Sequence, residues 1–120
     1  MFDEFTKLTL KMRTYYMKLE TNELIEKILD ENILIRTIAK EEFLKRDYNN
    51  LDVSDEILNK VIDKLSIEEI WYLASTKQDN HFIELVIEKL NAIFLYYEKN
   101  YPNHYLLKVN EQNKMFRLLK

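Results

Sequence analysis

The chain has 120 residues, of which 47% are apolar, and a net charge of −3, which is typical of one folded domain and excludes a disordered segment. It contains neither cysteine nor glycine, which excludes disulfides, thiolate metal sites, thiol catalysis and glycine-rich phosphate loops. A glycine-free chain with one proline, Pro102, favours helices joined by Asn- and Asp-containing turns.

Apolar residues at three- and four-residue steps indicate helices in the first half of the chain. The predicted helices span residues 3–19, 22–29 and 31–47. Thr21 is the predicted N-cap of the second, and residues 47–50 form a loop after the third. The residues predicted to face the core are Phe2, Phe5, Leu8, Met12, Tyr15, Tyr16 and Leu19 in the first helix, and Ile33, Leu34, Ile38 and Leu44 in the third.

Capping signals divide the second half, for which the predicted helices span residues 55–65, 67–75, 80–99 and 103–118. Ser54 caps the first of these, and Ser66 with Glu69 forms a capping box that opens the second. Pro102 suits the first turn of the last helix. The helix at 80–99 is the most hydrophobic and is predicted to be central, with an apolar face made of Phe82, Ile83, Val86, Ile87, Leu90, Ile93, Phe94 and Tyr97.

Three of these helices share a repeated pattern, because paired apolar positions begin at residues 33, 57 and 82. The stretch 65–86, with Ser66, Glu69 and Asp79, resembles a HEAT-like or leucine-rich-variant helical repeat, and the resemblance extends over residues 21–98. It implies stacked helical hairpins that bind macromolecules on an extended face, and it implies no catalytic residues. The chain lacks the proline of the first repeat helix, and only Arg36 matches the arginine of the second.

The predicted fold is therefore all-α, with six to seven helices stacked as hairpins around a solenoid-like, HEAT-like middle. Residues 1–120 form one domain, divided into an N-terminal helix at 1–20, repeat-like hairpins at 21–98 and a basic C-terminal helix at 99–120. Residues 21–98 carry seventeen acidic and nine basic side chains, whereas residues 99–120 carry one acidic and five basic. The middle is predicted to present an acidic surface.

Signals for an enzyme are weak in this sequence. The adjacent pairs Glu41/Glu42 and Glu68/Glu69 point about 100° apart on a helix, so neither pair converges on one substrate atom. The two histidines, His81 and His104, have no His or carboxylate four residues away, and Glu84 is the only local candidate partner of His81. We therefore expect no catalytic residue, no metal site and no cofactor.

Tyrosine-rich helix flanks favour a protein-binding module instead. Tyr72, Tyr96, Tyr97 and Tyr101 fall on or beside the flanks of their helices, and tyrosine is enriched at interface hot spots. Tyr96 and Tyr97 are adjacent, so both cannot point inward, whereas Trp71 and Phe94 are predicted to fill the core. An adaptor, inhibitor or immunity-type protein, encoded by a phage or a plasmid, fits this pattern. Its partner would be a basic or nucleic-acid-binding protein.

Two alternatives stay open. A small nucleic-acid-binding regulator would use the basic terminal helices, above all Lys108, Lys114, Arg117 and Lys120. A homodimer would bury the wide apolar face of residues 82–97. The N-terminal residues do not resemble a signal peptide and no apolar run could cross a bilayer, so we expect a cytoplasmic protein without membrane contact.

Overall fold

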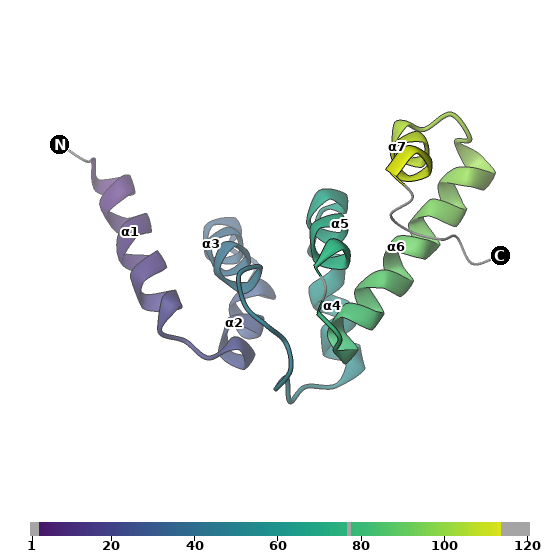
Figure 1. Cartoon of the computed structure of the whole chain (residues 1–120). Helices are drawn as coiled ribbons and strands as arrows, with labels where there is room; N and C mark the ends of the chain where they lie inside the picture. Colours follow the sequence, from purple (N-terminus) through teal and green to yellow (C-terminus); the bar gives the residue numbers. More distant parts are fainter. Residues whose placement is uncertain (1–2, 77, 114–120) are drawn as a thin grey trace. The chain divides into compact units, whose positions relative to one another are not determined.

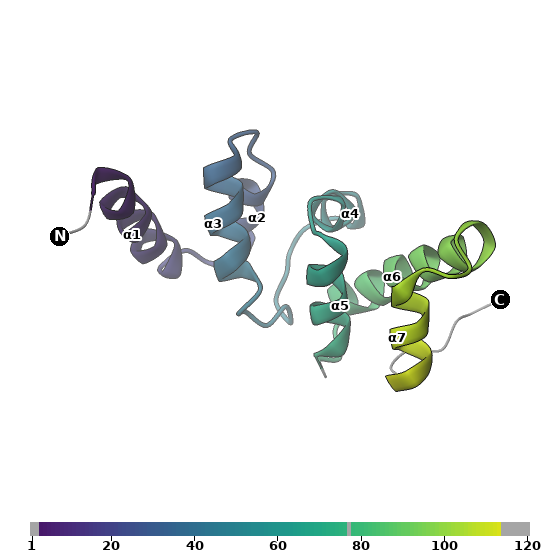
Figure 2. The ribbon, with the colours of Figure 1, turned by 90° about the horizontal axis from the view of Figure 1, so that it is seen from above.

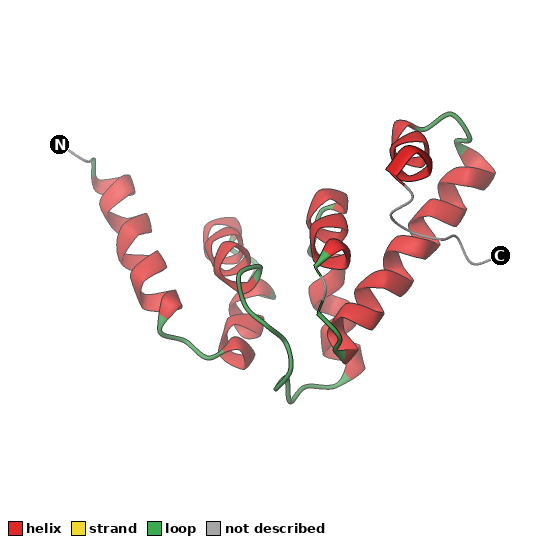
Figure 3. Cartoon of the chain, viewed as in Figure 1, coloured by secondary structure: helices red, strands yellow, loops and turns green. Residues whose placement is uncertain are grey.

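The computed structural model describes residues 3–76 and 78–113, and all regular structure in these ranges is α-helical (Figures 1 and 3). This confirms the predicted all-α class. The helices are α1 (Glu4–Met17), α2 (Thr21–Ile28), α3 (Ile33–Phe43), α4 (Asp55–Asp63), α5 (Ile67–Ser75), α6 (His81–Asn100) and α7 (Tyr105–Asn113).

Side-chain caps explain where most of these helices begin. In each case a polar side chain before the helix accepts a hydrogen bond from a free backbone N–H of the first turn. Ser66 and Glu69 form the predicted capping box, with Ser66 Oγ accepting at 3.1 Å and Glu69 Oε1 accepting at 2.8 Å. The other single-residue caps are Asp3 before α1, Asn32 before α3, Ser54 before α4 and Asn80 before α6.

The predicted boundaries differ from the structure at several helix ends. Glu20, not Thr21, is the N-cap of α2, where it forms a capping box with Glu23. α3 ends at Phe43, four residues earlier than predicted. The chain turns at residues 44–46, and Tyr48 in the loop that follows is buried. α7 begins at Tyr105, so Pro102 lies outside it. The predicted end of the last helix, at residues 114–118, lies outside the described residues.

Contacts divide the chain into two compact units, residues 1–64 and 65–120, a boundary that the sequence did not predict. In the first unit α2 and α3 form a hairpin, and α1 packs against α3 (Figure 1). The core of this unit takes Leu24, Ile25 and Ile28 from α2, and Ile38, Ala39 and Phe43 from α3.

In the second unit α5 and α7 both cross α6 (Figure 2). The predicted apolar face of α6 is largely buried within the single chain, through Phe82, Ile83, Val86, Leu90 and Phe94. Ile87 is exposed, so the face is narrower than predicted. Because most of it is already covered, it leaves little apolar surface for a second copy.

The repeat is only partly reflected in the structure. The hairpins α2–α3 and α5–α6 match its first and third copies. No helix occurs at residues 44–54, so α4 lacks the short helix that would precede it in the middle copy. The solenoid-like stacking stays a prediction.

The apolar stripe predicted for α1 faces the core only in part, through Tyr16. The buried side chains of α1 are Thr9 and Tyr16, which lie two turns apart on one line. Phe5, Leu8 and Tyr15 are exposed, because α3 covers only a narrow face of α1. Of the other residues in the predicted stripe, Met12 and Leu19 are half-buried, and Phe2 lies outside the described residues. Ile33, predicted to point inward at the start of α3, is also exposed.

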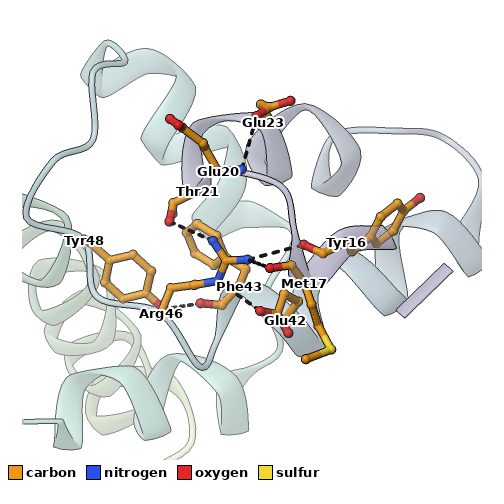
Figure 4. Close-up of polar contacts among 9 residues, drawn as sticks. All are labelled: Tyr16, Met17, Glu20, Thr21, Glu23, Glu42, Phe43, Arg46 and Tyr48. Carbon is orange, nitrogen blue, oxygen red and sulfur yellow. Dashed lines mark hydrogen bonds and ion pairs between the residues drawn. The ribbon is translucent and has the colours of Figure 1, made fainter. Parts of the chain in front are cut away.

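Arg46 connects three helices of the first unit (Figure 4). Its guanidinium donates to the carbonyls of Tyr16 and Met17 at 3.3 and 3.2 Å, and to Thr21 Oγ1 at 3.4 Å. It also pairs with Glu42 Oε1 at 3.0 Å. The two carbonyls belong to the last turn of α1, and the Tyr16 carbonyl also accepts the Leu19 N–H at 3.1 Å. A cation is favourable at this end of a helix.

The loop after α3 is anchored by Tyr48, which the sequence placed in a loop without predicting its burial. The Tyr48 hydroxyl donates to the Phe43 carbonyl at 2.8 Å, and the two ring centroids lie 4.8 Å apart (Figure 4). Both side chains are buried. The last carbonyl of α3 thus accepts two hydrogen bonds, from the Tyr48 hydroxyl and from the Arg46 backbone N–H at 3.0 Å.

Candidate protein-binding surface

A tight turn joins α6 to α7 and gathers aromatic side chains. The His104 N–H donates to the Tyr101 carbonyl at 2.9 Å, which closes a four-residue turn. Pro102 occupies the second position of this turn, where its fixed φ is favoured. The chain therefore reverses within four residues and brings rings from α6, the turn and α7 together.

Five rings form the tyrosine corner, defined as Tyr96, Tyr97, Tyr101, His104 and Tyr105. Tyr97 lies at its centre, with ring centroids 6.1 Å from Tyr96, 6.2 Å from Tyr101 and 4.1 Å from the stacked His104. His104 stacks in turn on Tyr105 at 4.9 Å. Tyr96, Tyr101 and Tyr105 are 55%, 55% and 61% exposed, whereas Tyr97 and His104 are half-buried. The prediction that Tyr96 and Tyr97 cannot both point inward is confirmed.

His104 holds this corner in place through its own backbone contacts. Its Nδ1 accepts the N–H of Leu106 at 3.2 Å, so the neutral ring carries its hydrogen on Nε2. This bond satisfies one of the free N–H groups at the start of α7, as a capping side chain does. The ring is thus fixed by a hydrogen bond and by stacking with two neighbouring rings.

Tyr72 lies apart from the corner, on an apolar groove of about 380 Å³. Trp71 also lines the groove and meets Phe94 edge-on, with centroids 5.3 Å apart. The predicted burial of Phe94 is confirmed, but Trp71 is only half-buried. The groove is lined by Ile67, Glu68, Trp71, Tyr72 and Ser75 of α5 and by Leu106 of α7.

Only one residue of the predicted basic surface lies within the described residues. Lys108 is exposed on α7. Lys114, Arg117 and Lys120 lie outside the residues that the structure describes, so the basic surface at the C-terminal end stays a prediction.

The side chains considered for catalysis have other partners. Glu41 pairs with Arg13 at 3.0 Å, and Glu42 pairs with Arg46. His81 Nδ1 lies 3.6 Å from Glu84 Oε2, and both side chains are exposed to solvent. Among residues 3–76 and 78–113, no group of three His, Asp or Glu side chains could hold a metal ion.

Three further residues contribute to the corner or to the groove but were not predicted as part of a protein-binding surface: His104, Tyr105 and Leu106. A signal was present, since Tyr97, Tyr101 and Tyr105 recur at four-residue steps on both sides of Pro102. Such spacing places aromatic rings around a turn once proline is assigned to the turn and not to the following helix.

Within the described ranges, no helix has both the length and the hydrophobicity needed to cross a membrane. Comparison with protein-family models, with curated proteins and with solved structures finds no match for this chain. Its function is therefore inferred from its own residues.

Proposed function

We propose that the chain is a non-enzymatic protein-binding module that covers a surface of a larger protein with its tyrosine corner. The observation that supports this proposal is the corner itself, where three tyrosine rings are more than half exposed yet packed against inner rings. Tyrosine offers a large contact area and loses little conformational freedom on binding. Binding through a surface that is already ordered costs less conformational entropy.

The groove and the local charge support a basic partner. Glu68 lines an otherwise largely apolar groove, and the segment 21–98 has a large excess of acidic side chains. A lysine or arginine could lay its aliphatic stem along Trp71 and Tyr72 while its charge meets Glu68. Such side chains line the nucleic-acid channels of other proteins. The module would then act as an inhibitor or adaptor by occluding that surface.

Site-specific photo-crosslinking tests the proposal. A photoreactive phenylalanine analogue replaces Tyr96 or Tyr101 in the full chain, and as a control replaces Ile33 of α3, which is more exposed than either tyrosine. The proposal predicts one protease-sensitive adduct from the corner positions and none from Ile33. The purified partner should then bind the Tyr96→Ala/Tyr101→Ala variant at least about tenfold more weakly, and Ile33→Ala normally. Equal adducts from all three positions would contradict the proposal.

The nucleic-acid alternative rests on one feature, the stacked rings of Tyr97, His104 and Tyr105 beside the exposed Lys108. Flat rings with nearby cations can stack on bases and contact phosphates. Under this alternative the corner adducts would be sensitive to nuclease. Binding of single-stranded nucleic acid at low salt would also be lost in Lys108→Glu.

A further inference from the structure

An apolar seam runs along one flank of α1, and α3, the helix that packs against α1 in the first unit, leaves it largely exposed. The seam consists of Phe5, Leu8, Met12 and Tyr15, which follow the alternating three- and four-residue spacing of a coiled coil. Phe5, Leu8 and Tyr15 are 62%, 49% and 57% exposed, and Met12 is half-buried. Contiguous exposed apolar residues of this kind mark an interaction surface.

The contact with α3 does not explain the seam. Thr9 and Tyr16, which face the protein, each follow a seam residue by one position and therefore lie about 100° around the helix. The rim on the other side of the seam consists of Glu4, Lys11 and Lys18, all exposed. The rim with Thr9 and Tyr16 is occupied by α3, whereas the rim with Glu4, Lys11 and Lys18 faces solvent and can contact another helix, as the flanking positions of a coiled coil do.

We propose that α1 pairs with α1 of a second copy of this chain, in antiparallel orientation about a two-fold axis. In this arrangement Phe5 of each copy faces Tyr15 of the other, and Leu8 faces Met12. Each large ring then has an aromatic partner, and the two smaller apolar side chains meet at the centre. A two-fold interface requires such self-complementarity of a single patch.

Charge complementarity supports the antiparallel orientation. The two free rims face each other in this pairing, which places Glu4 of each copy opposite Lys18 of the other and Lys11 opposite its own equivalent. Two attractive pairs therefore flank one repulsive pair. A parallel pairing would instead set each free rim against the rim that is occupied by α3, and neither Glu–Lys pair would form.

The size of the seam sets the strength of the dimer. A helix of 14 residues is about 21 Å long, and four half-exposed side chains per copy bury in total roughly 800 Å². Stable interfaces bury about 1,200–2,000 Å². An interface of this size lies at the weak end of the range, so the pairing is expected to be reversible.

Sedimentation velocity on the full chain, from about 5 to about 500 µM, tests for this reversible pairing. The expected result is a concentration-dependent shift from monomer to dimer. Leu8→Glu places a charge against Met12 and should weaken the dimer at least about tenfold. The matched control Leu10→Glu introduces the same charge at a similarly exposed position on the opposite flank and should dimerise normally. Circular dichroism establishes that both variants remain helical.

A charge swap tests the orientation. Glu4→Lys and Lys18→Glu should each weaken the dimer about two- to tenfold at low salt, because each creates two like-charge pairs. The double variant should recover the original affinity. A chain that stays monomeric throughout, or a dimer equally weakened by both leucine substitutions, would overturn the proposal. A double variant that does not recover would overturn the antiparallel pairing.

Discussion

Arg46→Ala is expected to lower the free energy of unfolding of the first unit by about 2 kcal/mol. The side chains of Arg46 and Glu42 are only 21% and 15% exposed, so water screens their interaction less than that of a surface pair. Hydrogen bonds to charged groups contribute about 1.5–3 kcal/mol each when they are well formed. The bonds to Tyr16 and Met17 are long, at 3.3 and 3.2 Å, and water can replace part of them after the substitution. About 1 kcal/mol for each carbonyl bond is therefore a reasonable value.

Urea unfolding monitored by far-ultraviolet circular dichroism measures this loss. Arg13→Ala is the matched control, because Arg13 also connects α1 to α3, through a pair with Glu41 in which both side chains are nearly half exposed. Exposed pairs contribute less than about 1 kcal/mol, so this variant should lose little stability. Arg46→Lys keeps the charge but not the forked geometry and should recover only part of the loss. Equal losses from Arg46→Ala and Arg13→Ala would refute the reasoning.

Three further predictions follow from single contacts. Tyr48→Phe keeps the ring but removes the bond to the Phe43 carbonyl, and should cost about 1 kcal/mol in urea unfolding. His104→Ala should speed amide hydrogen exchange at the start of α7, whereas His104→Asn, which can also cap, should preserve most of the protection. Burial raises the pKa of Tyr16 above its usual value of 10.0. The contribution of this side chain to the free energy of unfolding is therefore complete below pH 10 and is lost as the pH rises through the higher native pKa. The stability of Tyr16→Phe should therefore fall less than that of the wild type between neutral and strongly alkaline pH.

Features that depend on a few adjacent residues were predictable from the sequence. Ser54, and Ser66 with Glu69, were identified correctly as caps because a cap needs only a polar side chain two or three residues before a free N–H. The burial of α6 was also predictable, since its apolar face repeats over about four turns. Tyr96, Tyr97 and Tyr101 lie in the tyrosine corner and Tyr72 lies on the groove, but their role in partner binding stays a prediction.

Features that depend on distant contacts were not predictable. The spacing of Phe5, Leu8 and Tyr15 shows that α1 has an apolar flank, but only the tertiary structure shows that α3 leaves these three side chains exposed. The role of Arg46 depends on the end of α1 lying beside the end of α3, about thirty residues away in sequence. Pro102 was assigned to a helix because proline suits both a first helical turn and a tight turn, and local sequence alone does not separate the two.

The thin attachment of α1 has a kinetic consequence. Since α1 contributes only Thr9 and Tyr16 as buried side chains, its detachment exposes far less apolar surface than separation of the α2–α3 hairpin. Local opening therefore starts at α1, at a lower free energy than global unfolding. Binding on the outer side of α1 should stabilise its docked state measurably, because a partner binds the docked helix and not the detached one. Binding at the seam should therefore slow hydrogen exchange of the α1 backbone amides.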